Sequence, residues 1–142
     1  MIYERFIKLT IESKIDSIDL LSVAVRAICK TVIHDPILLY NVVLCLVEAT
    51  TNVIKHAYHR KPGNLIEVLI TIDDFHLVFQ VIDSGEKTSI PPPKKELYSN
   101  AKDITSLPES GMGLFLIGQI MDQVSFDQQE GKNVLTMIKN IK

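Results

Sequence analysis

Alternating hydrophobic and polar residues predict five β-strands in this chain. The first strand covers residues 5–13, with Phe6, Lys8 and Thr10 on one side and Ile7, Leu9 and Ile11 on the other. The next two, 66–72 and 75–81, flank Asp73-Asp74, a connection short enough to predict an antiparallel hairpin. The last two, 124–126 and 134–141, close the chain around Glu130-Gly131.

Helical spacing of hydrophobic residues predicts three helices between these strands. Asp16 or Ser17 caps the first, which runs to about Val32 with apolar positions at Leu20, Leu21, Val23, Ala24, Ala27 and Ile28. The second begins at Asp35-Pro36, continues through Ala57 and stops before Lys61-Pro62-Gly63. The third covers 114–121. Residues 86–110 follow neither pattern, which is typical of a lid or binding loop.

These elements predict one α+β domain over residues 1–142. It is a two-layer α/β sandwich with a mixed, mostly antiparallel sheet and helices packed on one face.

The formal net charge of −2, with acidic and basic residues interspersed, argues against direct nucleic-acid binding. The charged N-terminus lacks the apolar run of a signal peptide. The apolar stretch 37–47, interrupted by Asn41, is too short to span a bilayer. Cys29 and Cys45 have no paired spacing and are read as buried hydrophobic residues. We therefore expect a soluble, cytoplasmic protein.

Glu48 and Asn52 are four residues apart and share one face of the second predicted helix. A carboxylate there is suited to orienting or deprotonating a hydroxyl group. The amide oxygen of Asn52 is a hard ligand of the kind that Mg²⁺ accepts alongside water and phosphate. Taken alone, the same spacing is equally typical of a solvated helix edge.

Asp83-Ser84-Gly85 follows an apolar strand directly. A carboxylate at a strand end is able to accept the exocyclic amine of adenine, and glycine lets a base or sugar approach the backbone closely. The alternative is an ordinary turn, because Asp-Ser-Gly is common turn chemistry.

Ser110-Gly111-Met112-Gly113 stands immediately before the third predicted helix. Backbone N–H groups at a helix N-terminus bind phosphate, and the long preceding loop favours this interpretation over simple glycine flexibility. Lys55 is suited to neutralising a phosphate and His56 to lining the pocket, although cations near a helix end also complement the helix dipole.

Three motifs together resemble the anti-sigma factor serine kinases, within the superfamily of gyrase, Hsp90, histidine kinases and MutL. The first, over residues 48–58, reads E-x-x-x-N-x-x-x-H-A-Y; the second is Asp83-Ser84-Gly85. The third runs from Ser110 through Gly111, Gly113 and Leu114 to Ile117, with Met121-Asp122 just beyond. The resemblance covers nearly the full chain and implies the histidine kinase-like ATPase fold.

The resemblance implies that ATP binds under the lid, with Mg²⁺ held by Asn52, adenine read by Asp83 and Glu48 acting as the general base. It assigns the remaining nucleotide contacts to Lys55, His56, Gly85, Gly111, Met112, Gly113, Leu114 and Asn133. It also implies a serine of a STAS-type anti-anti-sigma protein as phosphate acceptor, sequestration of a sigma factor, and a homodimer. In such homodimers the N-terminal strand and first helix lie near the interface.

The chain departs from the family pattern at two places. Glu86-Lys87 stands where many relatives carry a second glycine, and Lys132-Asn133 stands where many begin the last strand with Gly-Thr. We expect Asn133 to hydrogen-bond the base in place of that threonine, with Thr136 as the weaker substitute. Reduced nucleotide affinity would follow.

Two other functions compete with the kinase. One is a non-catalytic ATP-binding module that switches between protein partners and so regulates transcription, for example in a stress response. The other is the catalytic domain of a sensor histidine kinase, which the lack of a preceding dimerisation helix with a phosphoacceptor histidine disfavours.

Overall fold

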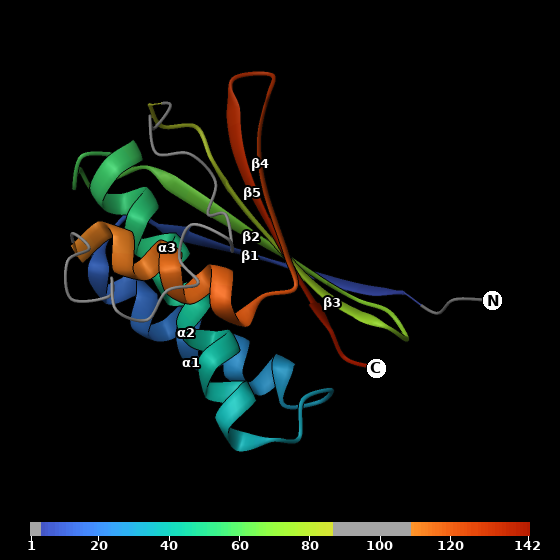
Figure 1. The fold of residues 1–142 in the computed structure, drawn as a ribbon. Coiled ribbons are helices and arrows are strands. Elements are labelled where there is room, and N and C mark those ends of the chain that lie inside the picture. The colour runs from blue at the N-terminus through green and yellow to red at the C-terminus, as the bar shows by residue number, and fades with distance from the viewer. Residues whose placement is uncertain (1–3, 87–108) are drawn as a thin grey trace.

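The computed structural model describes residues 4–86 and 109–142 (Figure 1). Its strands are β1 (Arg5–Glu12), β2 (Leu65–Ile72), β3 (His76–Asp83), β4 (Gln123–Gln129) and β5 (Lys132–Asn140). Its helices are α1 (Ile15–Cys29), α2 (Pro36–Asn52), the short π-helix η1 (Val53–Ala57) and α3 (Glu109–Ile120). Most of the predicted lid, 87–108, lies outside the described residues.

The strands form one sheet in the order β1-β2-β3-β5-β4. Every pairing among the described strands is antiparallel. The sequence predicts a mixed, mostly antiparallel sheet, and the described strands contain no parallel pair. The predicted hairpin around Asp73-Asp74 is confirmed as β2–β3. The register places Asp83, the last residue of β3, between Ile66 on β2 and Asn133 on β5. The start of β2, the end of β3 and the start of β5 thus lie side by side at the edge of the sheet that carries the candidate site.

The helices α1, α2 and α3 cover one face of the sheet, as predicted (Figure 1). The core lies between the two layers, where alternate residues of β2 and β3 are buried. Burying each large apolar side chain contributes roughly 1.5–3 kcal/mol. The largest fully buried side chains include Ile66, Ile70, Leu77, Phe79 and Met137 from the sheet, and Val25, Val42, Leu46 and Ile117 from the helices.

Helix α1 differs from its prediction at its start and in the face that it buries. It begins at Ile15 with Lys14 as N-cap, so Asp16 and Ser17 lie inside its first turn. Leu20 and Val23, two of the apolar positions that predicted the helix, are 76% and 70% exposed. The buried residues are Ile18, Leu21, Val25 and Cys29. Because α1 carries apolar residues on two faces, spacing alone does not decide which face meets the sheet.

Helix α2 begins as the sequence predicts. The Asp35 side chain accepts a hydrogen bond from the backbone N–H of Ile37, and Pro36 occupies the first turn. The single helix expected through Ala57 changes to π-helix at Val53. Such π-turns are rare and are often found at functional sites.

Within the described residues, the helical stretch Pro36–Ala57 is long and apolar enough to cross a membrane by length and composition alone. It is longer than the stretch 37–47 considered from the sequence. Of its apolar window, 44% is buried inside the protein. The core helix of a soluble protein meets the same criteria, so this finding is weak evidence for a membrane span.

Helix α3 begins at Glu109, five residues before its predicted start, and ends at Ile120. Two contacts attach its C-terminal end to β5. Lys139 Nζ donates to the carbonyl oxygen of Ile120 over 2.8 Å, and the Asn140 N–H donates to Asp122 Oδ2 over 2.7 Å. A cation at this end also complements the helix dipole. These contacts hold the C-terminal end of α3 against β5.

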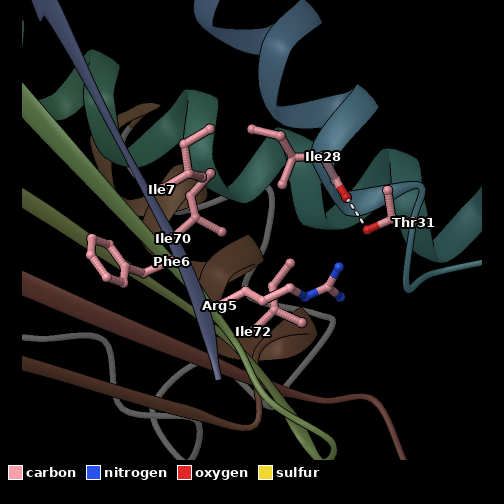
Figure 2. A pocket seen from close by; sticks show the side chains of 7 residues that line it. All are labelled: Arg5, Phe6, Ile7, Ile28, Thr31, Ile70 and Ile72. Atoms are coloured by element: carbon pink, nitrogen blue, oxygen red, sulfur yellow. Dashed lines mark hydrogen bonds between the residues drawn. The ribbon is translucent and has the colours of Figure 1, made fainter. Parts of the chain in front are cut away.

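A hollow of about 200 Å³ opens between β1, β2 and the C-terminal end of α1 (Figure 2). Its walls are apolar except for Arg5 and Thr31, and the Thr31 hydroxyl donates to the carbonyl oxygen of Ile28 over 2.7 Å. Ile72 lines it at the far end of β2 from Ile66, the partner of Asp83. The hollow is therefore remote from the candidate site.

Candidate functional site

Glu48 and Asn52 lie one turn apart at the C-terminal end of α2. Both side chains are partly exposed, whereas the neighbouring Ala49 and Thr50 are buried. Neither Glu48 nor Asn52 makes a side-chain hydrogen bond to another residue in the described part of the chain. The prediction that both lie on one face of the helix is confirmed, and their polar atoms have no hydrogen-bond partner among the described residues.

Gly113 brings α3 against this edge of α2. A Cβ built on Gly113 would lie 2.6 Å from Glu48 Oε2 and 3.5 Å from its Cδ. Only glycine leaves room for the carboxylate at this position. The second helix and the glycine motif, which are far apart in sequence, therefore meet as predicted.

The glycine motif itself differs from its prediction, because it lies inside α3 and not in a loop before it. The free backbone N–H groups of a helix are those of its first turn. Gly111, the third residue of α3, is within that turn, whereas Gly113 is the fifth residue. The contribution of Gly113 is therefore its small size beside Glu48. Leu114 is buried.

Asp83 is only 5% exposed at the end of β3. Its Oδ1 accepts hydrogen bonds from Asn133 Nδ2 and from the N–H of Gly85, each over 2.9 Å. Its Oδ2 receives no hydrogen bond from any residue that the structure describes. Burial raises the pKa of the Asp83 carboxyl, and the two hydrogen bonds oppose that shift. Among the described residues, Oδ2 is therefore an acceptor without a donor on a largely buried residue.

Asn133 lies directly opposite Asp83 in the register of β3 and β5 and is 3% exposed. Besides Asp83 Oδ1, its Nδ2 donates to the carbonyl oxygen of Gly85 over 3.2 Å. Gln128 Nε2 on β4 donates to Asn133 Oδ1 over 2.9 Å. Both amide hydrogens of Asn133 are thus used within the protein, so the expected hydrogen bond to the base stays a prediction, with Oδ1 as the atom that has a lone pair left.

Thr136 does not substitute for this contact. It lies opposite Gln80 and accepts a hydrogen bond from Gln80 Nε2 at 3.4 Å. Side chains of a strand alternate between the two faces of the sheet, so Thr136 and Asn133, three positions apart, point to opposite faces.

The Asp83-Ser84-Gly85 turn is attached to the end of η1 by backbone contacts. The Glu86 N–H donates to the carbonyl oxygen of Ala57 over 2.9 Å. A Cβ on Gly85 would lie 2.6 Å from that same oxygen. Glycine is required here because the obstacle is backbone, which cannot move aside as a side chain does.

The side chain of Tyr58 is a second link between η1 and the turn after β3. Tyr58 is the last residue of the first sequence motif, and the sequence assigned it no function. Its buried hydroxyl donates to the carbonyl oxygen of Leu65 over 2.7 Å and accepts from the Ser84 N–H over 2.9 Å. A buried tyrosine hydroxyl usually finds such partners. Tyr58 therefore joins η1, β2 and the turn after β3. Gln128 was also missed, because its role depends on strand register.

Lys55 and His56 lie in η1, the π-turn that follows Asn52, and both are partly exposed. No side-chain hydrogen bond or ion pair joins either residue to another described residue. Their predicted roles, together with those of Gly111 and Met112, stay predictions.

Comparison with known proteins identifies the family. The histidine kinase-like ATPase domain matches residues 11–139. The chain belongs to this family. The predicted family resemblance and the α+β fold are thereby confirmed.

Curated relatives of this ATPase domain include serine-protein kinases. RsbW of Staphylococcus epidermidis is 36% identical over 98 residues, which cover 67% of this chain and 61% of that protein. RsbW of Bacillus cereus is 33% identical over 94 residues, covering 65% of this chain and 58% of that protein. The matches thus span about three fifths of the length of these relatives.

A solved structure shares the fold of this ATPase domain. A chain in the SiaB–SiaC complex from Pseudomonas aeruginosa superposes with a TM-score of 0.55 at 16% sequence identity. The match covers 93% of this chain and 89% of that one. At this identity the likeness concerns the fold alone.

Proposed function

We propose that the protein is an ATP-dependent protein-serine kinase that also acts as an anti-sigma factor. It sequesters a sigma factor and phosphorylates a serine of a STAS-type anti-anti-sigma protein. The observation that carries the proposal is the approach of Gly113 on α3 to the Glu48 carboxylate on α2. The family and the RsbW relatives support the same conclusion.

The residues present fit a nucleotide and its metal ion. Asp83 is 5% exposed and its Oδ2 has no donor among the described residues, which suits the amine of adenine. Gly85 packs against the Ala57 backbone and holds the turn that carries Asp83, so its proposed nucleotide contact is through its own backbone. Asn52 offers an amide oxygen suited to Mg²⁺. Gly111, Met112, Leu114, Lys55 and His56 complete the proposed contacts around the phosphates.

The proposed chemistry needs few protein groups. Bound ATP would supply the γ-phosphoryl group and leave as ADP, and Mg²⁺ would neutralise the charge on the phosphates. Glu48 orients the acceptor serine and receives its hydroxyl proton. Phosphoryl transfer depends mainly on position and charge stabilisation, so one carboxylate, one amide ligand and the first-turn amides of α3 suffice.

The proposed setting is cytoplasmic, where sigma factors act, and the proposed assembly is a homodimer. Phe6 on the edge strand β1 and Leu20 and Val23 on α1 are at least 70% exposed. Exposed apolar side chains of this size support an interface near the N-terminal strand and first helix.

Transfer of label from γ-labelled ATP to an anti-anti-sigma protein tests the proposal. The wild-type protein should label the partner, and Glu48→Ala should abolish transfer while nucleotide binding and the fold are kept. Transfer by Glu48→Ala at the wild-type rate would show that the assigned base is wrong. Nucleotide binding without transfer by the wild type would favour the non-catalytic switch module.

A further inference from the structure

Hydrogen bonds within the protein use one oxygen of Asp83 completely. A carboxylate oxygen has two lone pairs, and those of Oδ1 are taken by Asn133 Nδ2 and the Gly85 N–H. Oδ2 alone remains for a ligand among the described contacts. The buried carboxylate therefore offers a ligand one acceptor oxygen and not two.

The orientation of the Asn133 amide is fixed from both sides. Its Nδ2 faces two acceptors, Asp83 Oδ1 and the Gly85 carbonyl oxygen, while its Oδ1 accepts from Gln128 Nε2. A reversed amide would place its oxygen against two acceptors and its nitrogen against a donor. The chain Gln128–Asn133–Asp83 thus has a single favourable arrangement.

This arrangement bears on which purine the site accepts. The adenine edge presents one donor, the 6-amino group, which one acceptor oxygen satisfies. The guanine edge presents two adjacent donors, N1–H and the 2-amino group, which pair with both oxygens of a carboxylate. With Oδ1 occupied, both guanine donors would compete for Oδ2, and two donors side by side cannot both point in line at one oxygen, so one hydrogen bond would be lost or bent.

We infer that Asn133, held by Gln128, is a positioning residue that makes the nucleotide site selective for 6-aminopurines over 6-oxopurines. The inference rests on the proposed nucleotide binding and adds the source of its base specificity. Asn133 acts through Asp83 and does not contact the base as a donor. A residue with only a structural role would alter the affinities for both purines alike.

The test is the ratio of ATP to GTP affinity, measured by calorimetry on the full chain. The wild type should prefer ATP by at least about tenfold. In Asn133→Ala, Oδ1 regains a free lone pair, so the ratio should fall about fivefold or more. An unchanged ratio in this variant, with ATP still bound, would overturn the inference and leave the proposed function standing. Absence of ATP binding by the wild type would instead contradict the function.

A second pair of variants keeps the test valid if Asn133→Ala does not fold. Gln128→Glu replaces the group that donates to Asn133 Oδ1 by an acceptor. The Asn133 amide should then turn its nitrogen away from Asp83, and the ratio of ATP to GTP affinity should fall. Gln129→Glu adds the same charge one residue along, where the native side chain donates to Asp127 Oδ2 over 2.8 Å and not to Asn133. Equal ratios in these two variants would overturn the role of Gln128.

Discussion

Glu48 Oε2 lies only 2.6 Å from the point where a Cβ atom on residue 113 would be. Because this oxygen ends a flexible side chain, a methyl group there would displace the carboxylate and spare the backbone. Gly113→Ala should therefore change the free energy of unfolding by less than about 1 kcal/mol, helped by the higher helix propensity of alanine. Labelled-phosphate transfer should fall at least tenfold, because general bases contribute about 10²–10⁴ in rate.

The Glu48→Ala background supplies the control for this variant. Without the carboxylate, Gly113→Ala meets no obstacle at Oε2 and should only stabilise the helix in urea unfolding. Full transfer activity in the single variant would show that Gly113 does not govern the position of Glu48.

Gly85→Ala should behave in the opposite way. Its Cβ would meet backbone, 2.6 Å from the carbonyl oxygen of Ala57 and 2.8 Å from its carbon. Overpacking against atoms that cannot turn aside typically costs about 1–3 kcal/mol. Urea unfolding should show this loss, well above that of Gly113→Ala. Equal stability of the two variants would contradict the described approach of the turn to η1.

Tyr58→Phe should loosen the turn that carries Asp83. The variant loses the donor to Leu65 and leaves the Ser84 N–H without its acceptor. A loss of about 1–2 kcal/mol in unfolding free energy is expected, together with weaker nucleotide binding. Tyr40→Phe is the matched control, because Tyr40 is 59% exposed. Similar effects of the two substitutions would argue against the role assigned to Tyr58.

Asp83 should make stability depend on pH. Its pKa is raised by burial above the ordinary value of 3.8, so ionisation is less favourable in the folded protein than in the unfolded chain. Its contribution to stability is therefore lost as the pH rises from 3.8 through the raised pKa. Asp83→Asn lacks this titration. As the pH rises through that range, the unfolding free energy of the wild type should therefore fall relative to that of the variant. A shift in favour of the wild type would contradict the described burial.

The proposed dimer interface is tested on α1. Sedimentation should show a dimer for the wild type and a monomer for Leu20→Glu, because a charge would be buried in the interface. Ile37→Glu, at a residue 71% exposed on α2, is the control and should remain dimeric. A monomeric wild type, or a dimeric Leu20→Glu, would contradict the proposal.

The sequence predicts the strands, the hairpin and the helix edge of Glu48 and Asn52, because alternation and helical spacing depend on local polarity. It does not predict the buried face of α1, where Leu20 and Val23 are as apolar as the residues that pack. The early start of α3 was missed because glycines usually end helices. Here Gly113 is tolerated in the helix because Glu48 needs the space.

The hydrogen bonds of Asn133 were also not predictable from the sequence. They depend on the register that pairs β3 with β5 and on Gln128 reaching Asn133 from β4. Motif spacing identified Asp83 as an acceptor. Only the register shows that one of its oxygens is already occupied.

Calorimetric titration of the purified protein with ATP and Mg²⁺ tests the central claim, nucleotide binding through Asp83 and Asn52, most directly. The wild type should bind one ATP per chain. Asp83→Asn, which replaces the free acceptor oxygen by a donor, should abolish binding, and Asn52→Ala should remove its dependence on Mg²⁺. A wild type that does not bind ATP, or an Asp83→Asn variant that binds it equally well, would contradict the account.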